Sequence, residues 1–113
     1  MKAKSVVPRE RAVRDGGEAN DQYLSDNAPG AALGFIAALE DGYRHIGRYP
    51  GTGSSRFAGE LSLPDLRFRR LENYPHLIFY CERSDYIDVW RVLHGMRDIP
   101  SWMHDPDLIA HVS

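Results

Sequence analysis

Two stretches in the second half of the chain carry the clearest pattern of apolar and polar positions. Residues 75–82 and 86–93 are rich in aromatic and β-branched side chains, and the polar segment Arg83-Ser84-Asp85 separates them. This pattern predicts two antiparallel strands joined by a tight hairpin. Because side chains alternate along a strand, the second stretch should divide into two faces. The predicted faces are Ile87, Val89, Arg91 and Leu93 on one side, and Asp88, Trp90, Val92 and His94 on the other.

The first half of the chain shows helical spacing instead. The short apolar run Val6-Val7 predicts a strand, and Pro8 suits the first turn of a following helix because its missing N–H is not needed there. Gly16 and Gly17 weaken this helix by about 1 kcal/mol each relative to alanine, so it needs tertiary packing or a close backbone neighbour. Its apolar positions are Ala12, Val13, Gly16, Tyr23 and Leu24.

A second helix is predicted between the turn-forming residues 26–30 and the segment Tyr49-Pro50-Gly51. Its apolar positions recur at i, i+3, i+4 and i+7, and they are Ala32, Phe35, Ile36, Leu39, Tyr43 and Ile46. The joint between the two helices is short, so we expect an antiparallel helical hairpin. Residues 50–55 resemble a phosphate-binding loop only in composition, since the Gly-Lys-Ser/Thr ending is missing, and are interpreted as a connector.

Residues 66–72 predict a further strand that carries Arg67, Arg69 and Arg70. Arg67 and Arg69 alternate along it and should project from the same face. The predicted order is β-α-α-β-β-β, followed by a short tail or helix around Trp102. We therefore expect an α+β fold, in which an N-terminal helical hairpin packs on an antiparallel sheet of about four strands.

Composition limits the possible functions. At 113 residues the chain fits one domain, residues 1–113. With 42% hydrophobic residues, 27% charged residues and a formal net charge of −2, it has no overall attraction to nucleic acid or to a membrane. The single cysteine, Cys81, excludes an intrachain disulfide, and its alternation with Leu77 and Phe79 places it in the core.

The chain shows no sign of a targeting segment or of a metal site. Basic residues near the N-terminus are not followed by an apolar stretch, and nowhere do about 18 apolar residues run together. The histidines show no spacing typical of metal ligands. We expect a cytoplasmic protein without a metal or other cofactor.

The predicted helical hairpin and the segment that begins LPDLRFRRLENYPHLIFY resemble the RelE/ParE toxins of bacterial type II toxin-antitoxin systems. The clearest similarities are YPHLIFY, IDVWRVLHG and RDIP, and they favour the ParE branch. The resemblance implies a small sheet-and-hairpin domain that a cognate antitoxin neutralises. It also implies a toxin that inhibits DNA gyrase by binding, without enzymatic turnover. The antitoxin is expected to be a ParD-like ribbon-helix-helix protein in a hetero-oligomeric complex.

The ribonuclease branch, similar to RelE, is the first alternative. There, basic residues on the central strands and an arginine after the last strand surround messenger RNA, and by resemblance Arg67, Arg69 and Arg97 match these positions. His76 stands where an arginine is typical, however, and Met103 falls where an assisting tyrosine would be. RNA cleavage needs a base, an acid and charge stabilisation placed together, so the set is incomplete.

Charge between Arg56 and Arg97 also disfavours a nucleic-acid groove, because seven arginines stand against six acidic residues. We expect no direct sequence-specific binding of nucleic acid. A ribosome-dependent messenger-RNA endonuclease therefore ranks second. A degenerate, non-toxic protein that keeps only the antitoxin-binding surface is the remaining alternative.

Candidate site residues follow from these readings. The target-facing candidates are Arg67, Arg69, Arg91, Arg97 and Trp102. The antitoxin-binding candidates are Leu33, Phe35 and Tyr43, although the same helical spacing also suits a place in the core. Trp90 suits either an interface or a position beneath the helices.

Overall fold

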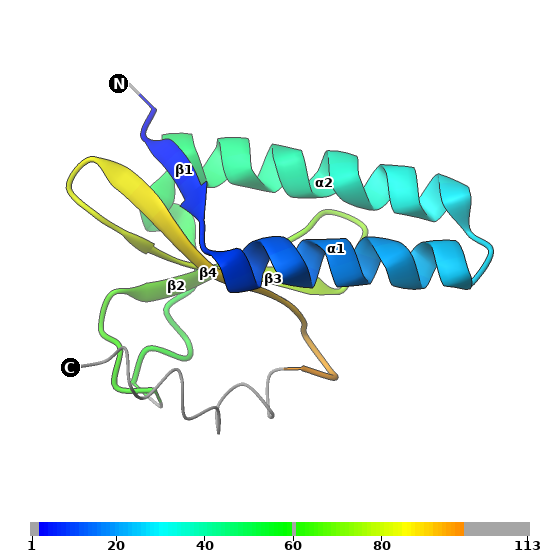
Figure 1. Ribbon diagram of the computed structural model, residues 1–113. Coiled ribbons are helices and arrows are strands. Elements are labelled where there is room, and N and C mark those ends of the chain that lie inside the picture. Colours follow the sequence, from blue (N-terminus) through cyan, green and yellow to red (C-terminus); the bar gives the residue numbers. More distant parts are fainter. Residues whose placement is uncertain (1–2, 60, 99–113) are drawn as a thin grey trace.

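The computed structural model describes residues 3–59 and 61–98 (Figure 1). Its elements follow the predicted order, with a 3-10 helix, η1, after the second α-helix. They are β1 (Ser5–Pro8), α1 (Glu10–Ser25), α2 (Pro29–Arg48), η1 (Pro50–Thr52), β2 (Leu66–Arg70), β3 (His76–Glu82) and β4 (Tyr86–His94). The predicted α+β fold with a helical hairpin on a four-stranded sheet is confirmed.

The sheet is mixed, which corrects the prediction of a wholly antiparallel one. Its strand order is β1-β4-β3-β2; β2, β3 and β4 pair antiparallel, whereas β1 runs parallel to β4 with Val6 opposite Ile87. Pro8 ends this strand and does not begin the helix. The following residue, Arg9, keeps an extended backbone and donates its N–H to the Val89 carbonyl at 2.8 Å. Pairing with β4 therefore delays the start of α1.

A β-bulge interrupts the predicted alternation in β4. Phe79 pairs with Arg91, but the next residue, Tyr80, pairs with Val89, so Trp90 is extra in the ladder. An extra residue reverses the faces beyond it. Val92 consequently joins the helix-side core, which also contains Val89, and Leu93 joins Trp90 on the opposite side. The predicted faces are thus wrong from Arg91 onward, because Arg91 lies opposite Phe79, which belongs to the same cluster as Leu93.

The helical hairpin forms because each helix has one apolar side and a defined end. On α1, Ala12 and Gly16 are buried, and a Cβ on Gly16 would lie 3.3 Å from Leu39 of α2, so the glycine permits close packing of the helices. The helix ends in a Schellman motif, with Asn27 in the left-handed region and the Ala28 N–H donating to the Tyr23 carbonyl at 2.9 Å.

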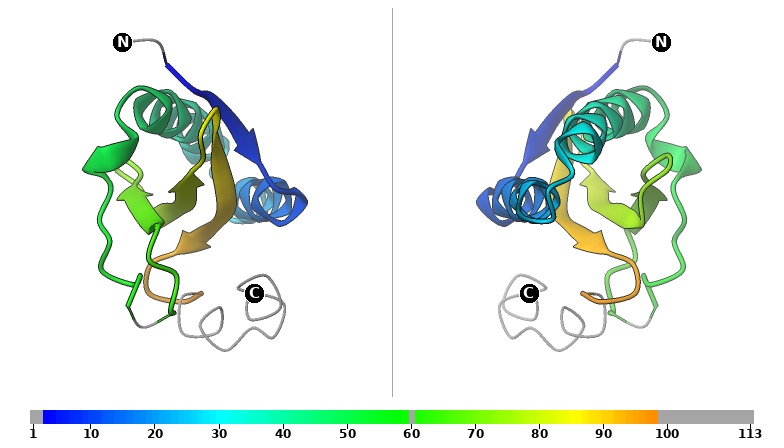
Figure 2. Two further views of the ribbon diagram at one scale, coloured as in Figure 1. Left: turned by 90° about the vertical axis from the view of Figure 1, so that its left-hand side faces the viewer. Right: turned by 90° about the vertical axis from the view of Figure 1, so that its right-hand side faces the viewer.

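Two hydrophobic clusters lie on opposite faces of the sheet. The helix-side cluster joins the hairpin to the sheet through Phe35, Ile46, Ile78 and Tyr80, among others. Among the described residues, the second cluster contains Leu63, Leu66, Phe79, Cys81, Trp90 and Leu93. Figure 2 shows the sheet between α1 and the segment that follows η1. That segment supplies Leu63 to the second cluster, so Trp90 lies there and not beneath the helices.

Candidate functional site

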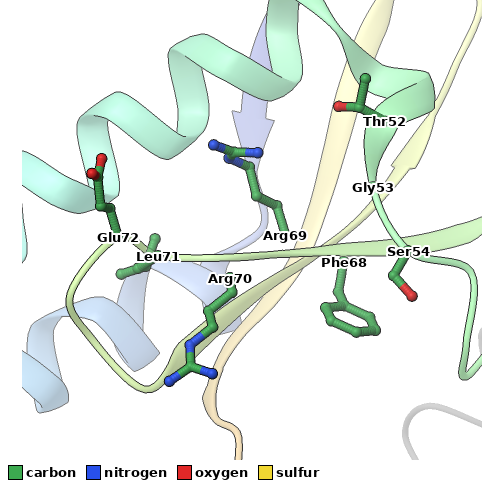
Figure 3. Close-up of a pocket in the computed structure, with 8 residues that line it drawn as sticks. All are labelled: Thr52, Gly53, Ser54, Phe68, Arg69, Arg70, Leu71 and Glu72. Atoms are coloured by element: carbon green, nitrogen blue, oxygen red, sulfur yellow. The ribbon is translucent and has the colours of Figure 1, made fainter.

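Arg67 and Arg69 lie on β2, the edge strand next to β3. Their cross-strand partners, Tyr80 and Ile78, belong to the helix-side cluster, so both arginines extend toward the side of α2. Figure 3 shows this direction for Arg69. Nη1 of Arg67 donates a hydrogen bond to the Gly53 carbonyl at 2.8 Å. The two arginines therefore share a face, as the alternation predicts.

Gly53 fixes the loop beside these arginines. A side chain at this position would collide with the ring and hydroxyl of Tyr80. The Tyr80 hydroxyl donates to the Pro50 carbonyl at 2.6 Å. The glycine-rich connector is thus held against β2 and β3 by a buried tyrosine, and its glycine is needed for close approach.

Arg70 and Phe68 point to the other side of the same strand (Figure 3). Arg69 and Arg70 line a shallow groove of about 540 Å³ beside the edge of β2. Its complete lining is Thr52, Gly53, Ser54, Phe68, Arg69, Arg70, Leu71 and Glu72. Two guanidinium groups therefore flank this strand edge, one on each face.

Arg91 is held by an aspartate. Its Nε and Nη2 donate to the two carboxylate oxygens of Asp15 at 2.8 and 3.0 Å, and Asp15 also accepts the Val92 N–H at 3.0 Å. The side chains of Arg91 and Asp15 are only 14% and 9% exposed. This pair ties α1 to the bulged part of β4. We therefore assign Arg91 to the fold and leave it out of the proposed target surface.

Arg97 is exposed in the turn that follows β4. Nδ1 of His94 accepts the backbone N–H groups of Met96 and Arg97 at 3.1 and 3.3 Å, and Asp98 accepts the His94 N–H at 2.8 Å. This turn directs the chain away from the sheet. The other predicted target-facing residue near this end, Trp102, lies outside the described residues.

The antitoxin-binding candidates divide between surface and core. Leu33 is 76% exposed, but Phe35 is fully buried in the helix-side cluster. Tyr43 packs against that cluster, and burial together with the Asp15 charge raises its pKa to about 12. Phe35 thus serves the core and cannot be the exposed anchor that the helical spacing suggested. The same spacing could not separate it from its neighbour Ile36, which is exposed.

Three exposed apolar residues of the hairpin were absent from the candidate list. They are Val13 and Leu24 on α1, and Ile36 on α2. Together with Leu33, they are the exposed large apolar side chains of the two helices, and we call this set the outer hairpin patch. Val13 and Leu24 are eleven positions apart, about three helical turns, so they lie on one side of α1. The sequence signal for these exposed residues was the width of the apolar stripe on each helix, which is greater than packing against the core on one side requires.

His76 is a core histidine. It is 5% exposed, lies in edge contact with Phe35 at a centroid distance of 4.8 Å, and its Nδ1 has no hydrogen-bond partner within the described residues. Burial and the nearby His94 lower its pKa to about 4. It is therefore neutral near pH 7 and poorly placed to exchange protons with a bound substrate.

Asp88 forms a polar network that the sequence analysis did not anticipate. Arg9 donates to both of its carboxylate oxygens at 2.9 Å, Arg83 donates at 3.1 and 3.3 Å, and Nε1 of Trp90 donates at 3.0 Å. Arg9 also stacks 4.3 Å from the ring centroid of Trp90. Burial alone would raise the pKa of Asp88, but these donors lower it below its usual value. The signal was an aspartate inside an apolar strand, which requires buried partners.

Other kinds of site are not formed by the described part of the chain. Within residues 3–59 and 61–98, no three His, Cys, Asp or Glu side chains come together in a way that could hold a metal ion. None of the helices there is both long and apolar enough to span a membrane. Cys81 is buried as predicted, and burial raises the pKa of its thiol to about 11. A reactive thiolate is therefore disfavoured.

Comparison with known proteins identifies the family. The family model for the ParE toxin of the type II toxin-antitoxin system parDE matches residues 6–99. Among solved structures, one described as the chromosomal ParDE TA system from P. aeruginosa is similar in fold, with a TM-score of 0.67 and 18% sequence identity. That match covers 81% of this chain and 96% of the other. No curated protein matches the sequence. The chain belongs to the ParE toxin family of type II toxin-antitoxin systems.

Proposed function

We propose that this chain is a toxin that inhibits DNA gyrase by binding to it, and that a ParD-like ribbon-helix-helix antitoxin neutralises it. Family membership supplies the class of protein. The observation that carries the choice of a binding mechanism is the placement of His76. The histidine at the position where the ribonuclease branch has a basic group is buried, with a pKa of about 4.

The remaining ribonuclease candidates also favour binding over cleavage. Arg67 and Arg69 extend toward α2 from the edge strand, whereas Arg97 lies in the turn after β4. Arg67 already donates to a backbone carbonyl. His94, three residues before Arg97, uses Nδ1 as an acceptor for backbone N–H groups. General acid-base catalysis needs a titratable group within hydrogen-bond reach of the reacting atoms. These arginines can bind a negatively charged group of a partner, and such binding needs no titratable group.

The outer hairpin patch is the proposed antitoxin-binding surface. Its residues, Val13, Leu24, Leu33 and Ile36, are between 37% and 76% exposed, and all lie on the two helices. Exposed apolar side chains on a helix face suit the apolar side of an amphipathic partner helix. This patch retains Leu33 from the sequence prediction and replaces the buried Phe35.

One experiment tests the proposed target. Purified toxin is added to gyrase, and DNA supercoiling is measured in parallel with cleavage of ribosome-bound messenger RNA. We expect loss of supercoiling and intact RNA. Normal supercoiling with cut RNA would overturn the proposal in favour of an endonuclease. Unchanged supercoiling, intact RNA and unaffected growth on expression would indicate a non-toxic protein that only binds the antitoxin.

A matched pair of variants tests the antitoxin surface. Leu33→Asp should leave toxicity intact but prevent neutralisation by the antitoxin, because a charge enters an apolar contact. Glu40→Ala, on an exposed position of the same helix, is the control and should remain neutralised. If Leu33→Asp is neutralised as well as the unaltered toxin, the antitoxin binds elsewhere.

A further inference from the structure

The outer edge of β2 is covered only in part. Phe68 and Ser54 exchange two backbone hydrogen bonds, each of 2.9 Å, and the Leu66 N–H donates to the Leu63 carbonyl at 3.0 Å. Ser54 and Leu63 thus cover this edge from Leu66 to Phe68. A sheet edge without such partners presents free N–H and C=O groups to any extended segment.

This cover ends before Arg70. In an antiparallel ladder, alternate residues direct their backbone groups to the same edge. Arg70 therefore faces outward like Phe68, while the Leu71 N–H points inward and donates to the His76 carbonyl at 2.9 Å. The register set by Ser54 would bring Thr52 opposite Arg70. Thr52 instead lies in η1, and its N–H donates to the Tyr49 carbonyl at 3.2 Å.

Charged side chains lie around the outward-facing backbone groups of Arg70. Arg69 extends from one face of the strand and Arg70 from the other, and both line the groove (Figure 3). Among the described residues, neither has a carboxylate partner, in contrast to Arg91 with its Asp15. Glu72 lines the far end of the groove. A segment bound at this edge would thus meet the positive side chains of Arg69 and Arg70, and beyond them the negative side chain of Glu72.

We propose that this open edge of β2 binds an extended acidic segment of a partner protein as an added strand. The backbone of the segment pairs with Arg70. Neighbouring side chains of a strand point to opposite faces, so two adjacent carboxylates meet Arg69 on one face and Arg70 on the other. Glu72 repels a third acidic position. This recognition does not depend on gyrase being the target, so its test is independent of the supercoiling assay.

The probe is an acetylated and amidated peptide in which two adjacent glutamates stand between threonine and valine residues, labelled with fluorescein. Its anisotropy is titrated with the full chain at low salt. We expect saturable binding that weakens about fivefold or more in Arg69→Thr and in Arg70→Thr, since each loses a charge-assisted contact. Arg48→Thr is the control: it removes one exposed arginine outside the groove and should bind as the unaltered chain does.

Backbone pairing is tested separately. Arg70→Pro removes an N–H that points away from β3, a substitution that edge strands tolerate, and it should weaken binding about fivefold beyond Arg70→Thr. Two further probes each carry an N-methyl group on one of two successive peptide amides. Only one of them should lose binding, because alternate amides face the edge. This comparison uses the unaltered chain and so does not depend on the folding of a variant.

Three results would overturn the proposal. The first is the absence of saturable binding by the unaltered chain. The second is an equal loss in Arg48→Thr, which would mean attraction to net charge alone. The third is equal binding by both methylated probes, which would mean that no strand is added.

Discussion

Two groups of arginines in this protein differ in how they are held. Arg91 forms a two-bond pair with Asp15, and Arg9 forms one with Asp88, whose side chain is 8% exposed. Arg70 and Arg97, by contrast, are exposed and have no carboxylate partner among the described residues. The first group joins α1 and β1 to β4. The second is available to a partner, so the difference separates arginines that stabilise the fold from arginines that can recognise a target.

The aspartates explain why the first group is needed. Asp88 and Asp15 sit at the boundary of the core, and a buried carboxylate is tolerated only when donors surround it. Their donors come from segments far apart in sequence, since Arg9 precedes α1 and Arg83 follows β3. The pairs therefore add polar contacts between elements that the helix-side cluster also joins, since Ala12 of α1 and Val89 of β4 both belong to that cluster.

The largest loss of stability is expected when a carboxylate is buried without an arginine partner. Ile78 is fully buried in the helix-side cluster. Ile78→Asp should cost at least about 5 kcal/mol, from the lost apolar contacts and an unpaired charge, which is enough to unfold a small domain. Circular dichroism of the purified variant should show loss of the folded signal. A folded, soluble variant would mean that β3 is not central to the core.

Removing a buried aspartate should have the next largest effect. Asp88→Ala leaves the donors of Arg9, Arg83 and Trp90 without their acceptor and should cost about 3 kcal/mol. Urea unfolding measures the change. Glu82→Ala is the matched control, because its pair with Lys4 is solvent-exposed and should contribute less than about 1 kcal/mol. Similar losses in both variants would contradict a special role for the buried network.

Acid should weaken the fold through His76. Its pKa is about 4 in the folded chain against an ordinary 6.5, so the unfolded chain takes up a proton first as pH falls. The stabilisation is complete above about pH 6.5 and is lost progressively down to about pH 4. Since one pKa unit corresponds to about 1.4 kcal/mol, the loss approaches about 3 kcal/mol.

The lowered pKa of Asp88 adds to this loss at the acidic end. Stability from that carboxylate is present above its unfolded pKa and is lost as pH falls through its lower folded pKa. Urea unfolding from pH 7 to below the ordinary aspartate pKa of 3.8 measures the combined effect. His76→Phe, which suits the aromatic surroundings, should flatten the upper part of this profile. An unchanged profile would show that another group dominates.

The smallest effect on stability is expected for the exposed arginines that have no carboxylate partner among the described residues. Arg97→Ala should change the unfolding free energy by less than about 0.5 kcal/mol while reducing toxicity, because the side chain is exposed. Arg91→Ala should instead destabilise the domain by about 2 kcal/mol, since Asp15 stays buried without its partner. Growth assays and thermal melting of both variants check this contrast. Full toxicity of Arg97→Ala would remove that residue from the proposed target surface.

The elements and their order could be predicted from the amino-acid sequence alone. Helical spacing from Ala32 to Ile46 and the runs on either side of Arg83-Ser84-Asp85 define the hairpins, because local periodicity reports which side of an element is apolar. The resemblance carried by YPHLIFY and IDVWRVLHG was also sufficient to indicate the ParE family, which the comparison with the family model confirms.

Which residues serve the core and which stay exposed depends on the tertiary structure. The direction of β1, the bulge at Trp90 and the burial of Phe35 beside the exposed Ile36 depend on neighbours distant in the chain. The same holds for the arginines: Arg91 and Arg97 look alike in sequence, but a buried Asp15 on α1 lies beside only one of them. The role of a charged residue depends on its neighbours in the folded chain, and local periodicity does not report those neighbours.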